Sequence, residues 1–193
     1  LTDGKTTWMK IPGAENEFYL PRMTWLPEKE ELMIQQLNRE QNHSKIYISN
    51  SKNGESRVLM EEKDEAWVDV RNTWPYQAKA GWKFINKGRE FLYTTEKDGW
   101  SHIYRFNIKN QTEFLVTKGD YDVVRPLSYD DKNDEVYFIA SPNNPTERYL
   151  YKTSADGKGK LKKVTPNVLE GSHNYQISTK SKYAFHSFSN YFT

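Results

Sequence analysis

Short runs of alternating apolar and polar residues, separated by polar turns, occupy most of this chain. The first complete example begins with Leu32–Leu37, continues with Ile46–Ile48, and reaches Ser56–Met60 through a turn that contains Asn53-Gly54. Alternation with a period of two predicts half-buried β-strands. Asn-Gly between two apolar runs favours a hairpin, because both residues tolerate positive φ. The pattern therefore predicts an antiparallel meander.

The same succession of strand, polar loop, strand, tight turn and strand returns along the chain, with a shorter strand ahead of each copy. The second strands of the four copies begin at Leu32, Phe91, Val136 and Tyr183, at spacings of 59, 45 and 47 residues. Four strands in every 40 to 50 residues is roughly the period of a β-propeller blade. Alternation alone leaves a generic β-sandwich open, but the repeated order of strands and turns favours blades.

The sequence thus predicts an all-β chain with little helix, made of about three and a half four-stranded antiparallel blades. The expected blade-like repeats cover about 18–62, 81–118, 124–166 and 173–193, with an inter-blade insertion at about 62–80. Closed propellers need roughly four to eight blades, because closure protects the sheet edges. We therefore expect further sequence to flank this partial propeller, and a first residue other than Met agrees with that expectation.

Composition narrows the functional classes. Aromatic residues make up 15% of the 193 residues, which excludes a disordered chain. The net charge is only +2, so nucleic acid is not an expected partner. The absence of cysteine excludes disulfides and Cys-ligated zinc. No apolar run approaches the ~20 residues of a transmembrane helix, and no targeting signal opens the chain.

Seven short motifs, in order along essentially the whole chain, resemble the later propeller blades of the dipeptidyl peptidase IV family. These motifs are Phe18–Trp25, Leu37–Asn42, Ala66–Asp69, Thr95–Tyr104, Thr117–Val123, Glu147–Tyr151 and Ser187–Ser189. Each is weak alone, but seven in the same order are hard to obtain by chance. The motifs are most similar to those of bacterial enzymes of the Bacteroides group.

The resemblance implies an eight-bladed propeller that caps an α/β-hydrolase domain in a serine exopeptidase of the prolyl oligopeptidase family. Such an enzyme releases X-Pro or X-Ala dipeptides from peptide N-termini and uses no cofactor. The expected partners are therefore a peptide substrate, the hydrolase domain and the remaining blades, in a parent that can form a homodimer. A periplasmic or cell-envelope location is implied in the same way.

The catalytic machinery of such an enzyme is not found in this sequence. A serine nucleophile of this class sits in a G-x-S-x-G turn, with Asp and His following later. Ser101 follows Gly99-Trp100, but the glycines that the turn requires after the serine are missing. We predict that the chain contains no catalytic residue and does not hydrolyse peptides on its own.

The other charged candidates have structural interpretations. The family holds the substrate amine with a glutamate pair, but Glu30-Glu31 and Glu61-Glu62 lack its acidic, aromatic-rich context and are interpreted as solvated turn charges. The four histidines lie on different repeats without metal-ligand spacing, so structural roles are expected and no metal site. These are His43, His102, His173 and His186.

The insertion is where part of a substrate channel is expected. By resemblance, the stretch after Trp67-Val68 directs an arginine or an aromatic residue toward the substrate, and the candidates are Val70, Arg71, Asn72, Trp74 and Tyr76. A guanidinium suits this task because its planar fork binds carbonyl and carboxylate oxygens. The added Trp74-Pro75-Tyr76 departs from the family pattern, so an inter-blade loop that packs its own aromatics remains an alternative.

Two other functions remain open for the whole chain. The first is a non-enzymatic propeller scaffold that binds another protein. The second is a glycan-binding or glycan-processing propeller, which requires paired carboxylates at a central channel, and the sequence offers no convincing pair.

Overall fold

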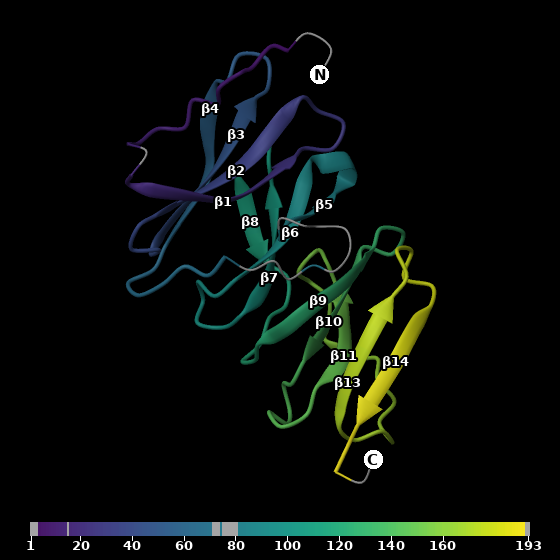
Figure 1. The fold of residues 1–193 in the computed structure, drawn as a ribbon. Coiled ribbons are helices and arrows are strands. Elements are labelled where there is room, and N and C mark those ends of the chain that lie inside the picture. Colours follow the sequence, from purple (N-terminus) through teal and green to yellow (C-terminus); the bar gives the residue numbers. More distant parts are fainter. Residues whose placement is uncertain (1–3, 15, 71–73, 75–80, 192–193) are drawn as a thin grey trace.

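Four antiparallel sheets follow one another along the chain (Figure 1). The computed structural model describes residues 4–14, 16–70, 74 and 81–191. The first three sheets have four strands each and the last has two. In every sheet the strands lie in sequence order, so each sheet is a meander that begins with one edge strand.

The strand boundaries follow the alternating runs of the sequence. The first sheet contains β1 (Phe18–Trp25), β2 (Glu31–Asn38), β3 (His43–Asn50) and β4 (Ser56–Lys63). The second contains β5 (Lys83–Ile85), β6 (Glu90–Thr95), β7 (His102–Asn107) and β8 (Thr112–Leu115). The third contains β9 (Val123–Asp130), β10 (Glu135–Ala140), β11 (Tyr149–Ser154) and β12 (Lys162–Lys163), and the fourth β13 (Ser172–Ile177) and β14 (Ala184–Ser189). Among the described residues, the 3₁₀ turn η1 (Asn86–Gly88) is the only helical element.

The hydrophobic cores lie between consecutive sheets. One cluster joins the first two sheets and includes Met33, Ile46 and Phe91. A second joins the second and third sheets, and a smaller third one, which includes Leu127 and Tyr175, joins the third and fourth. Within β6, Phe91 therefore faces one neighbour and Leu92 the other, so both faces of an inner sheet are buried.

This arrangement confirms the predicted fold class. Three complete blades and half of a fourth are stacked face to face, with a separate core at each junction. A sandwich would share one core between two sheets, so that alternative is excluded. The sheets span 18–63, 83–115, 123–163 and 172–189.

Each blade has two ends, which differ in the chain segments they carry. The tight turns β1–β2 and β3–β4, with their counterparts in later blades, lie at one end, here called the hairpin end. The β2–β3 loops and the connections between sheets lie at the other, the connection end. There the amide of Val68 donates to the carbonyl of Gln41, and Val123 donates to Ser101. Each connection therefore runs beside the loop of the blade it leaves.

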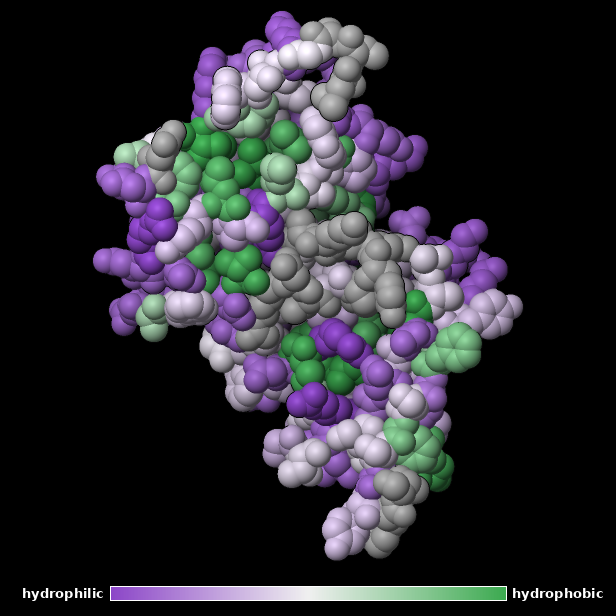
Figure 2. Space-filling view, viewed as in Figure 1, coloured by the Kyte–Doolittle hydropathy of each residue, from purple (hydrophilic) through white to green (hydrophobic). Residues whose placement is uncertain are grey.

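The first strand also carries exposed apolar side chains. Leu20, Met23 and Trp25 on β1 are all more than half exposed. Figure 2 shows apolar surface over the first sheet.

Candidate functional site

The predicted channel stretch begins at the connection end of the first blade. Asp64 fixes the backbone at the start of this stretch. One of its carboxylate oxygens accepts hydrogen bonds from the amides of Ala66 (2.7 Å) and Trp67 (3.0 Å). These two bonds hold the pKa of Asp64 below its ordinary value. Val68 then turns inward and is buried. The path of the insertion is therefore fixed locally as it leaves β4.

Two of the five predicted channel residues can be placed. Val70 is half-buried. Trp74 is 5% exposed and belongs to the cluster between the second and third sheets, where its indole Nε1 has no hydrogen-bond partner among the described residues. At this residue the structure shows core packing. Arg71, Asn72 and Tyr76 lie outside the described residues, and the assignment of the stretch to a substrate channel stays a prediction.

A chain of polar contacts crosses the first sheet beside the start of the insertion. Nε of Arg22 on β1 donates to Oε1 of Gln35 at 2.5 Å, and Nε2 of Gln35 donates to Ser44 Oγ at 2.7 Å. The Arg22 guanidinium also lies 4.4 Å from the ring centroid of Trp82, just before β5. Burial lowers the pKa of Arg22 to about 10, and the charges of Glu62 and Asp69 oppose that change. Arg22 is thus held between two blades with carboxylates nearby.

Glu62 corrects one expectation from the sequence. It is not a solvated turn charge but a half-buried residue of β4 that accepts a hydrogen bond from Thr95 Oγ1 of the second sheet. Burial raises the pKa of Glu62, while Thr95 and the positive charges of Lys97 and Arg22 act in the opposite direction. By contrast, Glu30 is exposed and pairs with Lys52 at 2.6 Å, as expected for a turn charge.

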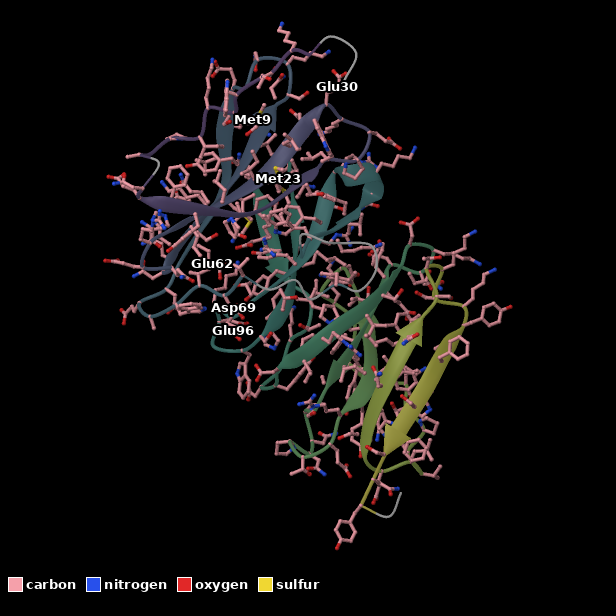
Figure 3. All side chains as sticks on the ribbon, in the orientation of Figure 1. Met9, Met23, Glu30, Glu62, Asp69 and Glu96 are labelled. Atoms are coloured by element: carbon pink, nitrogen blue, oxygen red, sulfur yellow. The ribbon has the colours of Figure 1, made fainter. Side chains whose placement is uncertain are left out.

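Further polar side chains continue this cluster onto the second sheet. Glu113 accepts hydrogen bonds from the Tyr93 hydroxyl and the Lys97 ammonium, and Lys97 also lies 4.2 Å from the centroid of the Tyr104 ring. Figure 3 shows Glu62, Asp69 and Glu96 near one another at the connection end, whereas Glu30 marks the hairpin end.

The space around this cluster is too small for a ligand. Two cavities adjoin Glu62 and Asp69, with volumes of ≈ 10 Å³ and ≈ 20 Å³. A cavity of roughly 10–15 Å³ holds one water molecule. The cluster is therefore packed, and its geometry suits the fixing of the insertion against the second blade rather than binding.

Ser101 and the histidines occupy structural positions. Ser101 is 2% exposed, its hydroxyl donates to the carbonyl of Val123, and its amide donates to Asp122. A hydroxyl committed to a backbone carbonyl inside the protein is not placed to attack a peptide. The neighbouring His102 is buried and lies 2.8 Å from the Asp98 carboxylate through Nδ1. Among the residues that the structure describes, no three possible metal ligands lie together.

Comparison with known proteins assigns the chain to a family. The model of the dipeptidyl peptidase IV (DPP IV) N-terminal region matches residues 1–193. The chain belongs to this family. The resemblance seen in the seven motifs is confirmed, and the chain is a partial N-terminal propeller of DPP IV type.

Relatives of this DPP IV segment include proteins named as active and as inactive peptidases. A probable dipeptidyl peptidase 4 of Aspergillus fumigatus is 26% identical over 171 residues, which cover 87% of this chain and 21% of that protein. The inactive dipeptidyl peptidase 10 of Mus musculus is 27% identical over 149 residues, which cover 73% of this chain and 18% of that protein. The chain thus spans about a fifth of the length of these relatives.

Solved structures show the same fold. The crystal structure of Porphyromonas gingivalis dipeptidyl peptidase 4 superposes with a TM-score of 0.77 at 24% identity, over 94% of this chain and 24% of that one. A putative dipeptidyl aminopeptidase IV from Bacteroides ovatus gives a TM-score of 0.69 at 23% identity, over 88% of this chain and 26% of that one. A source within the Bacteroides group remains a prediction for this DPP IV segment, since its curated relatives include fungal and rodent proteins.

Sequence reasoning missed the polar residues that hold the insertion in place. Arg22, Glu62 and Asp69 come from the first strand, the fourth strand and the connection of one blade. No motif links them, because the charges of Glu62 and Asp69 act on Arg22 only once the sheet and its connection have folded.

Proposed function

We propose that this chain is the non-catalytic propeller portion of a serine exopeptidase, and that it gates and orients the peptide. The enzyme would release X-Pro or X-Ala dipeptides from peptide N-termini. The match of the whole chain to the DPP IV N-terminal region carries this proposal. The sequence contains no serine elbow, which supports the non-catalytic role.

The proposed gating role rests on the position of the polar contacts at the connection end of the first two blades. Bonds of Asp64 and Val68 hold the start of the insertion at the connection end, and the Arg22–Glu62 region lies there as well, where two blades meet. A segment held in this way loses little conformational freedom on meeting a peptide, which favours orientation of the substrate over simple contact. Arg71, by its chemistry, would supply the oxygen-binding group.

The rest of the proposal concerns parts beyond this chain. The α/β-hydrolase domain would supply nucleophile, acid and base, and the remaining blades would close the ring. We place the enzyme in the periplasm or cell envelope, with a homodimer as its assembly. Among the described residues, no helix is long and apolar enough to cross a membrane.

A non-enzymatic binding scaffold is the second candidate function. One observation favours it: the mouse relative named as inactive is as similar to this chain as the fungal relative named as a peptidase. Identity in this segment therefore does not separate an active parent from an inactive one.

Hydrolysis of Gly-Pro and Ala-Pro chromogenic substrates tests the first candidate. We expect the full-length protein that carries this chain to turn over both substrates, and its Ser101→Ala variant to retain that activity. The chain alone, with folding checked by circular dichroism, should be inactive. Full-length protein without turnover would favour the scaffold, and turnover by the chain alone that disappears in Ser101→Ala would overturn the non-catalytic assignment.

A further inference from the structure

A hollow of ≈ 560 Å³ lies between the third and fourth sheets at the connection end. Its lining comes from the start of β9, the loop before β11 and both strands of the fourth sheet. The residues that matter most here are Arg125, Arg148, His173, Asn174 and Phe188. Sites for small ligands and ligand groups usually measure roughly 300–1,000 Å³, so this hollow is large enough for part of a peptide.

Backbone contacts hold Arg148 beside the first strand of the fourth sheet. Its amide donates to the carbonyl of Gly171, and its carbonyl accepts from the amide of His173 at 2.8 Å. The residue forms a parallel bridge with Ser172. The Arg148 side chain is exposed and makes no ion pair with a described residue. Its position is fixed while its charge stays available.

The second guanidinium is oriented by a side chain. Nη2 of Arg125 on β9 donates to Oδ1 of Asn174 on β13. An amide oxygen orients the arginine without neutralising it. Among the described residues that line the hollow, none carries a carboxylate. Glu147, which precedes Arg148, is bonded to the Tyr149 hydroxyl, and the Lys163 ammonium lies 3.5 Å from the Tyr149 ring centroid. Arg125 and Arg148 are therefore the charged groups that line the hollow, with the Glu147 carboxylate outside the lining and bonded to Tyr149.

A buried histidine completes the lining. His173 is 4% exposed, and its Nδ1 lies 2.8 Å from Nε2 of His186. Burial, with the positive charge of His186 and Lys163, lowers the pKa of His173, while the Leu169 carbonyl and Glu147 act in the opposite direction. Nε2 of His173 has no hydrogen-bond partner among the described residues. This atom has less than 1 Å² of accessible surface, so it is closed off from the hollow and His173 contributes packing to the lining.

We propose that this hollow binds a peptide carboxylate, held by the guanidinium groups of Arg148 and Arg125. Charge-assisted bonds from arginine suit carboxylates because the planar fork matches the two oxygens. Phe188, stacked at 5.3 Å on His173, provides apolar contact beside the charged groups.

The peptide as the source of this carboxylate rests on the proposed function. The hollow and the start of the insertion lie at the same end of the blades. Its carboxylate could be the C-terminal group or an acidic side chain downstream of the cleaved bond. Recognition there would make the enzyme prefer short or acidic peptides.

Calorimetry with N-acetylated peptides on the full-length protein tests the site without hydrolysis. The probes are N-acetyl-trialanine acid, the same peptide as its amide, and N-acetyl-Ala-Glu-Ala amide. We expect one or both acids to bind about tenfold more tightly than the neutral amide, because bonds to charged groups contribute that much. Tighter binding of the first acid identifies the C-terminal carboxylate, and of the second an acidic side chain.

Two variants and one control locate the site. Arg148→Gln and Arg125→Gln should each remove most of the preference for the acids. Arg57→Gln, an exposed arginine at the hairpin end, should leave it unchanged. Equal affinity for acid and amide, or a preference that survives Arg148→Gln, overturns the inference.

Turnover of Gly-Pro chromogenic substrate separates this inference from the proposed function. Turnover without a preference for carboxylates rejects the proposed carboxylate site and keeps the proposed peptidase function. A preference that Arg148→Gln abolishes, in a protein without turnover, keeps the site and rejects the peptidase.

Discussion

The guanidinium of Arg22 lies over the indole ring of Trp82, 4.4 Å from its centroid, and joins the first strand of one blade to the residue just before the first strand of the next. Trp82 is 2% exposed, and the arginine has lost enough water for its pKa to fall to about 10. A cation over an aromatic face gains most when both are desolvated. This contact therefore belongs to the packing between blades as much as to the polar cluster.

Replacement of Arg22 by Met should destabilise the chain by about 1–3 kcal/mol, since it removes the stacking, the bond to Gln35 and one of the positive charges that act on Glu62. Urea unfolding followed by tryptophan fluorescence measures the change. Arg39→Met is the matched control, because Arg39 stacks on Tyr19 at 4.2 Å but is exposed. Equal losses for the two variants would contradict a special role for burial.

The raised pKa of Glu62 predicts a dependence of stability on pH. The folded chain binds this proton more tightly than the unfolded chain, so wild-type stability should fall as pH rises from the ordinary value of 4.5 through the folded-state pKa. Glu62→Gln remains neutral and can still accept the bond from Thr95. Its stability relative to wild type should therefore increase with pH across that window, as measured by urea midpoints.

Glu61→Gln provides the control with the opposite sign. Hydrogen bonding from His43, with a contribution from Lys45, lowers the pKa of Glu61. Its stabilising effect is therefore present above the ordinary glutamate pKa and is lost at lower pH. This variant should lose a little stability at neutral pH, with a small effect because the side chain is 42% exposed. The same slope for both variants would refute the assignment to Glu62.

Arg105 on β7 should be the most sensitive charged residue at the junction of the second and third blades. Its guanidinium pairs with Glu90 at 2.7 Å within its own blade, and with Asp134 (3.0 Å) and the Ala155 carbonyl (3.2 Å) of the next. Arg105→Met leaves these acceptors half-buried and should cost about 3 kcal/mol or more. Lys152→Met breaks the pair with Glu135 inside one blade and should cost less. Thermal unfolding compares the two.

Gly119, in the connection between the second and third blades, should not tolerate alanine. Its φ is +137°, and a Cβ there would lie 2.6 Å from the ring of buried Tyr121. Gly119→Ala should cost about 1–3 kcal/mol from backbone strain and steric overlap. Gly99→Ala shares positive φ but meets nothing within 4 Å, so its loss should be smaller. Similar thermal shifts for both would exclude the contact with Tyr121 as the cause.

Much of the fold could be predicted because it is local. Each strand follows an alternating run, and the Asn53-Gly54 turn lies between β3 and β4 as expected. The candidate site could not be predicted in the same way. The bond from Thr95 to Glu62 joins residues 33 positions apart, and Trp74 was predicted to lie in the channel although its ring is packed in the core.

A β-bulge shows why alternation was insufficient for Glu62. Ile46 pairs with Met60 and Tyr47 with Val58, so Leu59 is the extra residue of β4. In a regular strand, Glu62 would lie on the same face as Val58, which is 39% exposed. The bulge at Leu59 reverses the alternation for the residues after it, so Glu62 lies on the opposite face, toward the second blade.

The sequence by itself determined the strands, their grouping into blades and the family, since a period of two and a repeat of fixed order are written in the chain. Only the tertiary structure decided which polar groups meet. Alternation predicts which face of a sheet a side chain lies on. It does not predict the residue that packs against that face, because that residue belongs to another blade. Arg22 with Trp82, Glu62 with Thr95 and the backbone of Arg148 with that of His173 become pairs because the sheets stack beside one another.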